Sequence, residues 1–258
     1  MHIRLEDSLH LTKPGKRPYN EDYVYPGAQN TLNSNHSNVF LVCDGVGGSE
    51  RGEVASRLVC TEMFNVLKGR SVMSDEVIQV AINRAQLSID EYIAQHQIEQ
   101  TMATTMTLVG FVEDGAIMAH VGDSRIYHVR NGEIRYCTED HSLVNELVSQ
   151  SLITREEAKN HPQKNVITKA ISGTDLKLTP SVHRTADIEP GDYFFLCTDG
   201  VLESIDDPYL LEVLADNSIS NGEKVELIDA RCASNSNDNY SLYLIQVEAV
   251  DCITYFQR

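Results

Sequence analysis

Long hydrophobic runs are missing from this 258-residue sequence. No stretch approaches the roughly 20 apolar residues that are needed to span a bilayer. The first seven residues, Met1 to Asp7, carry charges where a signal peptide has an apolar core. We therefore expect a cytoplasmic protein with no membrane partner.

Blocks of Lys or Arg are also missing. The chain has 38 acidic and 21 basic residues and a formal net charge of −17. This balance argues against a general nucleic-acid or acidic-membrane surface, because both partners are polyanions that bind clustered basic side chains. The acidic surface suggests a basic partner instead.

Closely spaced cysteine pairs are missing as well. The six cysteines are scattered, and several lie in apolar runs, so the sequence predicts buried free thiols and no disulfide or zinc site. They are Cys43, Cys60, Cys137, Cys197, Cys232 and Cys252.

The most informative stretch that is present runs from Val39 to Gly48. Its first five residues, 39–43, are all apolar and predict a strand that is buried on both faces. Asp44 ends this strand, and a glycine-rich turn that begins with Gly45 follows. The apolar spacing after the turn predicts a helix over residues 53–67.

Three further acidic residues also stand at the ends of strand-like segments. Asp199 follows the apolar run 193–197, Asp123 follows residues 116–121, and Asp238 directly precedes the alternating segment 241–247. A single Asp in a turn is usually structural. Several clustered carboxylates would repel one another unless a cation held them together, so this pattern predicts a metal site.

The remaining pattern predicts one domain that combines strands and helices. Residues 104–137 are expected to form an antiparallel meander with turns at 113–115 and 131–132. Residues 142–170 have helical spacing and include a capping-box candidate at Thr154, and we expect this segment to be a mobile flap. The other expected elements are a strand at 9–12 and helices at 75–97, 208–215 and 223–234.

The chemistry of these residues points to phosphate. Carboxylate and carbonyl oxygens favour Mg²⁺ or Mn²⁺ over zinc. If Asp44 lies between Asp199 and Asp238, it can bridge two ions, and a water held by both ions is a nucleophile. Arg17, four residues before Glu21, is suited to grip a phosphate through parallel hydrogen bonds. No Asp-x-Asp and no Gly-x-x-x-x-Gly-Lys motif is present, which argues against an aspartyl-phosphate enzyme and a P-loop.

Over nearly its whole length the sequence resembles the metal-dependent Ser/Thr protein phosphatases of the 2C type (PPM family), in their bacterial branch. Each motif is weak alone, and their common order makes the resemblance strong. The motifs are Arg17-x-x-Asn20-Glu21-Asp22, Asp44-Gly45-x-Gly47-Gly48, Ala103-Thr104-Thr105, Gly122-Asp123-Ser124-Arg125, Thr138-x-Asp140-His141-Ser142, His161-Pro162, Asn165-Val166-Ile167-Thr168-Lys169-Ala170, Thr198-Asp199-Gly200-x-x-Glu203 and Asp238-Asn239.

The resemblance implies an α+β fold: a four-layer αββα sandwich of two antiparallel sheets flanked by helix pairs, with a metal centre between the sheets. It implies a protein Ser/Thr phosphatase that uses two or three Mn²⁺ or Mg²⁺ ions and attacks the phosphate with a metal-bridging water. It also implies phosphoprotein substrates, an opposing Ser/Thr kinase and a monomer.

The resemblance also assigns roles to residues. Arg17 would clamp the substrate phosphate, and the flap at 142–170 would lie beside the site. The implied metal ligands are Asp44 as the bridge, the Gly45 carbonyl, Asp199 and Asp238, with Asp22 and Glu21 acting mainly through water and Asp123 holding a third ion with Asp199.

Two positions depart from the family. Val46 stands where many animal members have a His that is proposed to protonate the leaving group, and Ser49 stands where many bacterial members have a His. The general acid is therefore unassigned. His141 and His161 are candidates, although a His without a partner is weak evidence for acid–base work. Two other functions stay open: a catalytically idle phosphoprotein-binding module and a small-molecule phosphatase.

Overall fold

The structure is a computed structural model that describes residues 2–27, 37–47, 49, 51–175 and 177–251. Its strands form two antiparallel sheets of five strands each. The first sheet has the order β1 (His2–Lys13), β10 (Tyr240–Asp251), β9 (Tyr193–Cys197), β6 (Arg125–Arg130) and β7 (Glu133–Cys137). The second has the order β2 (Tyr23–Tyr25), β3 (Val39–Cys43), β4 (Met106–Val112), β5 (Gly115–Val121) and β8 (Ser181–Thr185).

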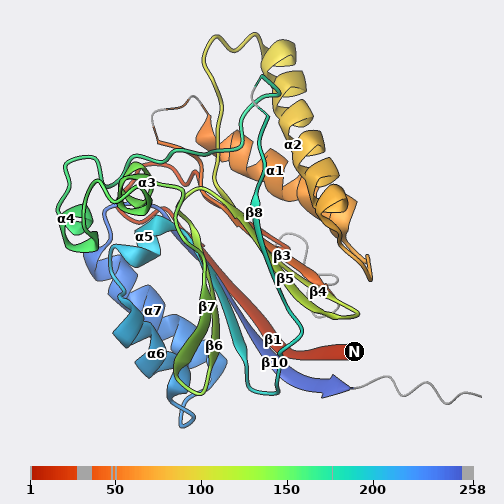
Figure 1. Cartoon of the computed structure of the whole chain (residues 1–258), viewed down its shortest axis with the longest axis vertical. Helices are drawn as coiled ribbons and strands as arrows, with labels where there is room; N and C mark the ends of the chain where they lie inside the picture. Colours follow the sequence, from red (N-terminus) through yellow and green to blue (C-terminus); the bar gives the residue numbers. More distant parts are fainter. Residues whose placement is uncertain (1, 28–36, 48, 50, 176, 252–258) are drawn as a thin grey trace, which may run out of the picture.

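Helices cover the outer face of each sheet, as Figure 1 shows. Helices α1 (Gly52–Leu67) and α2 (Asp75–His96) pack on the second sheet. The first sheet is covered by α6 (Asp207–Ala215) and α7 (Asn221–Asn235), and the short α5 (Asp199–Leu202) directly follows β9. Two short helices, α3 (Leu143–Ser149) and α4 (Arg155–Lys159), lie within the segment 142–170. The predicted four-layer αββα sandwich is therefore confirmed.

The four layers are held by three apolar cores, and β3 shows how the sequence produces them. Successive side chains of a strand point to opposite faces. Val39, Leu41 and Cys43 pack against α1 and α2, whereas Phe40 and Val42 pack between the sheets. An uninterrupted apolar strand is required here because β3 has a hydrophobic neighbour on each side.

The predicted meander over residues 104–137 is wrong in one respect. Strands β4 and β5 pair in the second sheet, whereas β6 and β7 pair in the first, and the turn at 122–124 crosses between them. Both faces of β5 and most of β6 are buried. Because the β4–β5 hairpin and the β6–β7 hairpin lie in different sheets that stack on each other, each strand has a neighbouring layer to pack against. Apolar content alone does not distinguish this arrangement from a single sheet.

Three strands differ from the sequence prediction. The strand predicted at 9–12 is the end of β1, which extends back to His2 because it pairs with the long β10. Strand β2 was not predicted, because its three residues are too few to show a pattern. Strand β8 was not predicted either, because its mostly half-buried side chains form no alternating pattern. The predicted helices near 53–67, 75–97, 208–215 and 223–234 are confirmed, and the capping box of α4 is formed by Thr154 and Glu157.

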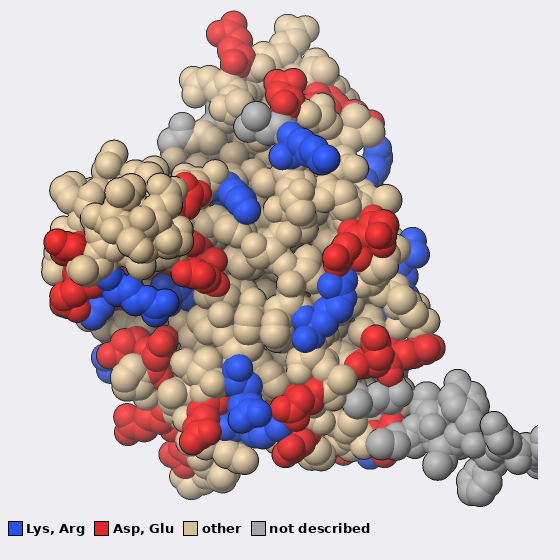
Figure 2. All heavy atoms as spheres, viewed as in Figure 1, with Lys and Arg blue, Asp and Glu red and all other residues tan. Residues whose placement is uncertain are grey.

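Surface and thiol chemistry agree with the composition. The five cysteines in the described part of the chain are free thiols, and Cys252 lies outside the described residues. On the face shown in Figure 2, Lys and Arg side chains are interspersed with acidic ones. None of the helices that the structure describes has the length and apolar character needed to cross a membrane.

Candidate metal centre

Asp44 follows the last residue of β3, and two threonines hold its backbone. The Asp44 carbonyl accepts hydrogen bonds from Thr104 Oγ1 at 2.7 Å and from the Thr105 N–H at 2.8 Å. The Asp44 N–H donates to Thr105 Oγ1 at 3.1 Å. Because these bonds fix the main chain of Asp44 on both sides, its carboxyl group is held in place at the end of the strand.

Asp22 lies directly before β2 and has only 6% of its surface exposed. Its Oδ2 accepts a hydrogen bond from Thr198 Oγ1 at 3.0 Å, whereas its buried Oδ1 has no partner among the described residues. The pKa of Asp22 is raised to about 7, chiefly by burial, and the nearby charge of Asp199 contributes to the rise. A buried carboxylate oxygen without a donor is costly unless a cation or water satisfies it.

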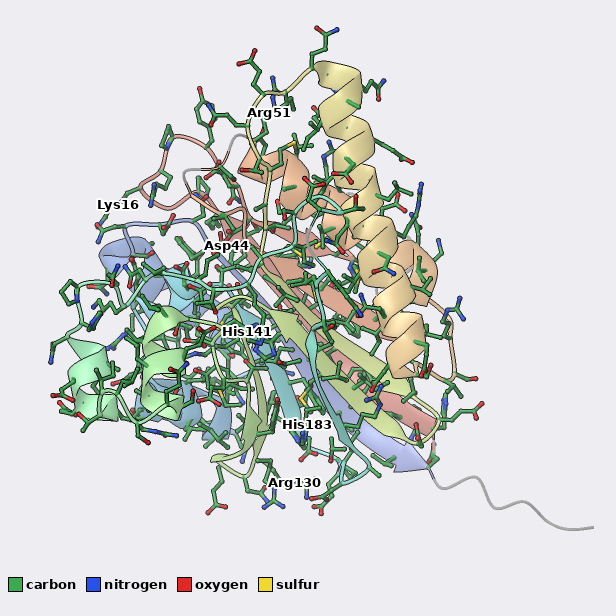
Figure 3. All side chains as sticks on the ribbon, turned by 45° about the horizontal axis from the view of Figure 1, so that its top comes forward. Lys16, Asp44, Arg51, Arg130, His141 and His183 are labelled. Carbon is green, nitrogen blue, oxygen red and sulfur yellow. The ribbon has the colours of Figure 1, made fainter. Side chains whose placement is uncertain are left out.

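Asp199 is the first residue of α5, and its carboxyl group lies within hydrogen-bonding reach of Asp44. Burial raises the pKa of both groups, and mutual repulsion with Asp22 raises that of Asp44 further. The Asp44 carboxyl group therefore interacts with those of both Asp22 and Asp199. Figure 3 shows Asp44 at one end of the sheets.

Asp238 and Arg17 meet at the rim of this cluster. Arg17 Nη2 donates to Asp238 Oδ2 at 2.8 Å, and Asp238 is close enough to Asp199 to raise its pKa. The Arg17 side chain is 53% exposed, so it is accessible from solvent. A cationic donor thus stands beside the carboxylates, where a phosphate oxygen could reach it.

Glu21 and Gly45 are joined by a backbone hydrogen bond from Gly45 N to Glu21 O at 3.1 Å. A side chain at position 45 would lie 2.5 Å from the Gly52 carbonyl carbon, so only glycine permits the start of α1 to pack this closely on the turn. Burial raises the pKa of the Glu21 carboxyl, and Glu53 adds to the shift.

Asp123 lies in the turn that crosses from one sheet to the other. Burial raises its pKa to about 7, and the nearby Asp199 adds to the shift. All five aspartates named from the sequence therefore come together at one end of the sandwich, although they arrive from five separate segments.

The oxygen atoms of this cluster suit a divalent cation, although the side chains that the structure describes are not arranged around one. In the described part of the chain, no three His, Cys, Asp or Glu side chains stand as the ready ligands of one ion. The carboxyl groups instead lie against one another, against Thr198 and against Arg17. The raised pKa values and the unpartnered Asp22 Oδ1 are what a cation would relieve, and an all-oxygen set fits Mg²⁺ or Mn²⁺.

Two buried residues that hold the site were given no role from the sequence. Asn239 accepts from Glu21 N and donates to the carbonyls of Pro14 and Tyr19, at 2.8–2.9 Å, so it ties the Arg17 segment to the start of β10. Thr198 links Asp22 to the N–H of Ser241. The sequence offered one indication of these roles, because Asn239 directly follows Asp238 and Thr198 directly precedes Asp199.

Neither candidate histidine is poised as a general acid. His141 Nδ1 accepts from Gly122 N at 3.1 Å, and burial lowers the pKa of His141 to about 3, so the ring is neutral at pH 7. His161 Nδ1 accepts from Gln163 N at 3.1 Å, within its own turn. The general acid stays unassigned.

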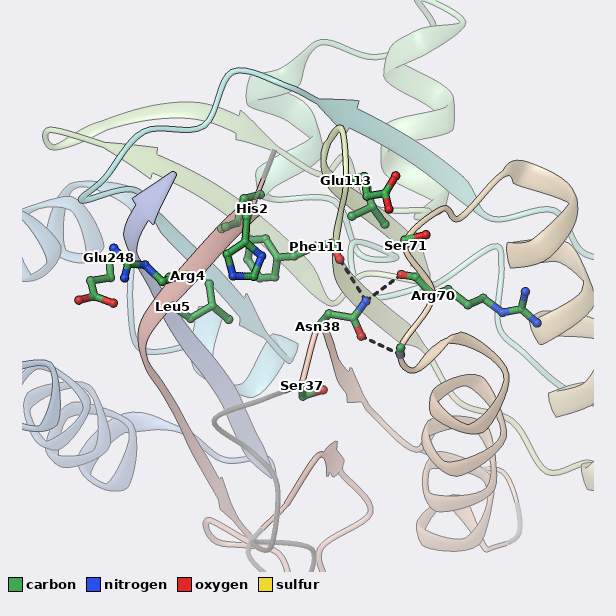
Figure 4. A pocket seen from close by; sticks show the side chains of 13 residues that line it. His2, Arg4, Leu5, Ser37, Asn38, Arg70, Ser71, Phe111, Glu113 and Glu248 are labelled. Atoms are coloured by element: carbon green, nitrogen blue, oxygen red, sulfur yellow. Dashed lines mark hydrogen bonds between the residues drawn. The ribbon is translucent and has the colours of Figure 1, made fainter. Parts of the chain in front are cut away.

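A cavity of about 690 Å³ lies at the opposite end of β3 from Asp44 (Figure 4). Asn38 lines it and bonds to the carbonyls of Arg70 and Phe111. The lining contains none of the five clustered aspartates, so this cavity is separate from the candidate centre.

The four-layer αββα sandwich with an acidic centre at one end is typical of a metal-dependent phosphatase. Comparisons with known proteins identify the family. The sequence model of the family described as "Protein phosphatase 2C" matches residues 19–233. The chain belongs to this family.

Individual relatives and structures agree with this assignment. The chain is 33% identical to protein phosphatase PhpP of Streptococcus pneumoniae, over 96% of this chain and 99% of that protein. It is similar to the crystal structure of the Mycobacterium tuberculosis serine/threonine phosphatase PstP/Ppp, with a TM-score of 0.80 and 28% identity over 95% of this chain and 99% of the other. A structure of the PstP catalytic domain in complex with two manganese ions has a TM-score of 0.75 and 27% identity over 95% of this chain and 99% of the other.

Proposed function

We propose that this chain is a protein Ser/Thr phosphatase that hydrolyses phosphoserine and phosphothreonine with the help of Mn²⁺ or Mg²⁺. The single observation that carries the proposal is the interaction of the buried Asp44 carboxyl group with those of Asp22 and Asp199, with Arg17 nearby on Asp238. Family membership and the manganese ions in the related PstP structure support it.

The proposed ligands are those that the family resemblance implies, and the aspartates among them lie together in the structure. Asp44, the Gly45 carbonyl, Asp199 and Asp238 would hold the ions directly. Glu21 and Asp22 would act mainly through waters, and Asp123 with Asp199 would hold a third ion. When bound, the ions supply charge neutralisation and an activated water at neutral pH.

Arg17 would bind the substrate phosphate. A guanidinium has five N–H donors, and the bond to Asp238 uses one of them, so a bidentate contact to a phosphate is available. Asn239 fixes the backbone on both sides of Arg17 and therefore restricts where the guanidinium can reach. Arg17 and Asp44 are the two residues to which we assign direct roles in the reaction.

The finer parts of the proposal concern the chain as a whole. We infer a single catalytic domain over residues 1–258, with 142–170 as a flap. The two ends of this segment are joined by a hydrogen bond from Leu143 N to Val166 O at 2.8 Å, which would let the helices between them move as one unit. A cytoplasmic monomer that opposes a Ser/Thr kinase completes the proposal and follows from the sequence expectations.

The test is hydrolysis of a phosphothreonine peptide and of p-nitrophenyl phosphate, with Mn²⁺, with Mg²⁺ and with chelator. Wild type is compared with Asp199→Asn and with Asp114→Asn, an exposed turn residue, as the matched control. We expect metal-dependent turnover that is lost only in Asp199→Asn. No turnover with any metal would support a phosphoprotein-binding module, and a preference for nucleotides or sugar phosphates over peptides would support a small-molecule phosphatase.

A further inference from the structure

His141 holds both backbone polar groups of Gly122, the residue before Asp123. The His141 N–H donates to Gly122 O at 2.9 Å, and the Gly122 N–H donates to His141 Nδ1 at 3.1 Å. One residue thus satisfies the donor and the acceptor of the turn that crosses between the sheets. Leaving this N–H unpaired would destabilise the turn, because a buried donor without an acceptor loses its hydration with no compensating bond.

The turn is also held from its other side. Gly122 has φ of +103°, and a side chain there would lie 2.6 Å from Thr105 Cγ2. Ser124 Oγ and Thr105 Oγ1 are hydrogen-bonded at 2.8 Å, and Thr105 in turn binds the Asp44 backbone. The two neighbours of Asp123 in the sequence are therefore both held in place: Ser124 by Thr105, and Gly122 by His141.

The hydrogen bonds of the His141 ring define its tautomer. Because Nδ1 accepts from Gly122, the hydrogen must be on Nε2, which donates to Ser181 Oγ at 2.8 Å. The ring stacks on His120 with centroids 4.4 Å apart and planes within 3°. Burial, His120 and Lys169 all lower the pKa of His141, so the Nδ1 lone pair is free to accept.

His141 also stands at the base of the segment 142–170. Its carbonyl accepts from Thr168 N at 2.8 Å, and the next residue, Ser142, forms a β-bridge with Ile167. The same residue therefore joins this segment to the turn that carries Asp123.

We propose that His141 is a positioning residue of the metal centre. Its Nδ1 lone pair fixes the Gly122–Asp123 turn and thereby aims the Asp123 carboxylate at the neighbourhood of Asp199. The inference rests on the proposed function, in which Asp123 is a metal ligand. It gives His141 a role in place of the general acid considered from the sequence.

The chain offers a matched pair of substitutions. In His141→Asn the amide oxygen can take the place of Nδ1, whereas in His141→Gln the amide lies nearer the place of Nε2. Mn²⁺ binding is measured by calorimetry, with kcat and KM on a phosphothreonine peptide and the thermal midpoint as parallel readouts. His183→Gln is the control, because His183 stacks on Tyr136 and lies outside this network.

We expect His141→Gln to weaken the lowest-affinity Mn²⁺ step by about tenfold or more, since loss of a group that orients a ligand costs roughly 10–100-fold in affinity. His141→Asn should stay within about threefold of wild type, and His183→Gln should match it. Equal effects of the Asn and Gln variants, or no effect of either, would overturn the proposal.

A measurement on wild type keeps the test independent of variant folding. Long-range ¹H–¹⁵N NMR reports which imidazole nitrogen carries the proton, and we expect Nε2 at pH 7 with or without the diamagnetic ion Mg²⁺. A protonated Nδ1 would overturn the inference. Failure of wild type itself to bind Mn²⁺ would instead overturn the proposed function, so the two failures are distinguishable.

Discussion

Asp44→Asn should make the metal-free protein more stable while abolishing its activity. Burial raises the pKa of the Asp44 carboxyl group well above its usual value, and repulsion from Asp22, Asp199 and Asp123 raises it further. A group whose pKa is raised in the folded state destabilises that state at a pH where the unfolded chain is charged. The amide of Asp44→Asn does not ionise, so the variant lacks both the cost of burying this charge and the repulsion. We expect a gain of about 1–2 kcal/mol in the free energy of unfolding.

The assay is thermal unfolding followed by circular dichroism, at pH 7.5 in chelator and again with Mn²⁺. A gain of 1–2 kcal/mol corresponds to a midpoint about 2–8 °C higher for a chain of this length. Mn²⁺ should stabilise wild type and leave Asp44→Asn unchanged, because a ligand stabilises only the state that binds it. A lower midpoint for Asp44→Asn in chelator would show that the Asp44 charge does not destabilise the metal-free protein. Equal stabilisation of both proteins by Mn²⁺ would show that Asp44 is not a metal ligand.

Three further substitutions test the supports of the site and the opposite end of the fold. In Asp192, burial raises the pKa but hydrogen bonds from Arg130 and His128 outweigh it and leave the pKa at about 2. Because the pKa of Asp192 is lower in the folded state, its charged form stabilises the fold above pH 4, and this stabilisation is lost as the pH falls toward 2. In Asp192→Asn the free energy of unfolding, measured with urea, should therefore change less with pH between 4 and 2. At pH 7 the variant should be less stable than wild type by about 3–5 kcal/mol. Thr198→Val leaves an oxygen of Asp22 and the N–H of Ser241 without this partner, and it should lower the free energy of unfolding in urea by about 2–4 kcal/mol. Thr198→Ser keeps the hydroxyl group and should retain most of the wild-type stability. Asn239→Ala frees the Arg17 segment and should lower kcat/KM on a phosphopeptide by about 10–100-fold with an unchanged fold, and an unchanged kcat/KM would contradict the positioning argument.

Elements with a distinctive local composition could be predicted from the sequence alone. The five apolar residues of β3 followed by Asp44 predict both a doubly buried strand and an acidic residue at its end, and the structure has both. The same reasoning located Asp199 after β9 and Asp238 before β10. These predictions succeed because a strand buried on both faces needs an unbroken apolar run.

Long-range pairing was not predictable from the sequence. The crossing between β5 and β6 depends on which neighbours bury their faces, and the half-buried edge strand β8 has no pattern of its own. The role of His141 depends on Gly122, nineteen residues away, and on the tautomer that this contact selects. Such contacts join residues whose local sequence carries no sign of the partner.

The most direct test of the metal centre is anomalous diffraction from crystals grown with Mn²⁺. We expect two strong peaks, both within ligand distance of the Asp44 carboxylate, with Asp199 and Asp238 near one of them. We also expect Arg17 to be free to contact a bound phosphate or phosphate analogue. Peaks away from Asp44, or an Asp44 carboxylate that contacts no ion in crystals where Mn²⁺ is bound elsewhere, would show that Asp44 is not a ligand of the metal centre.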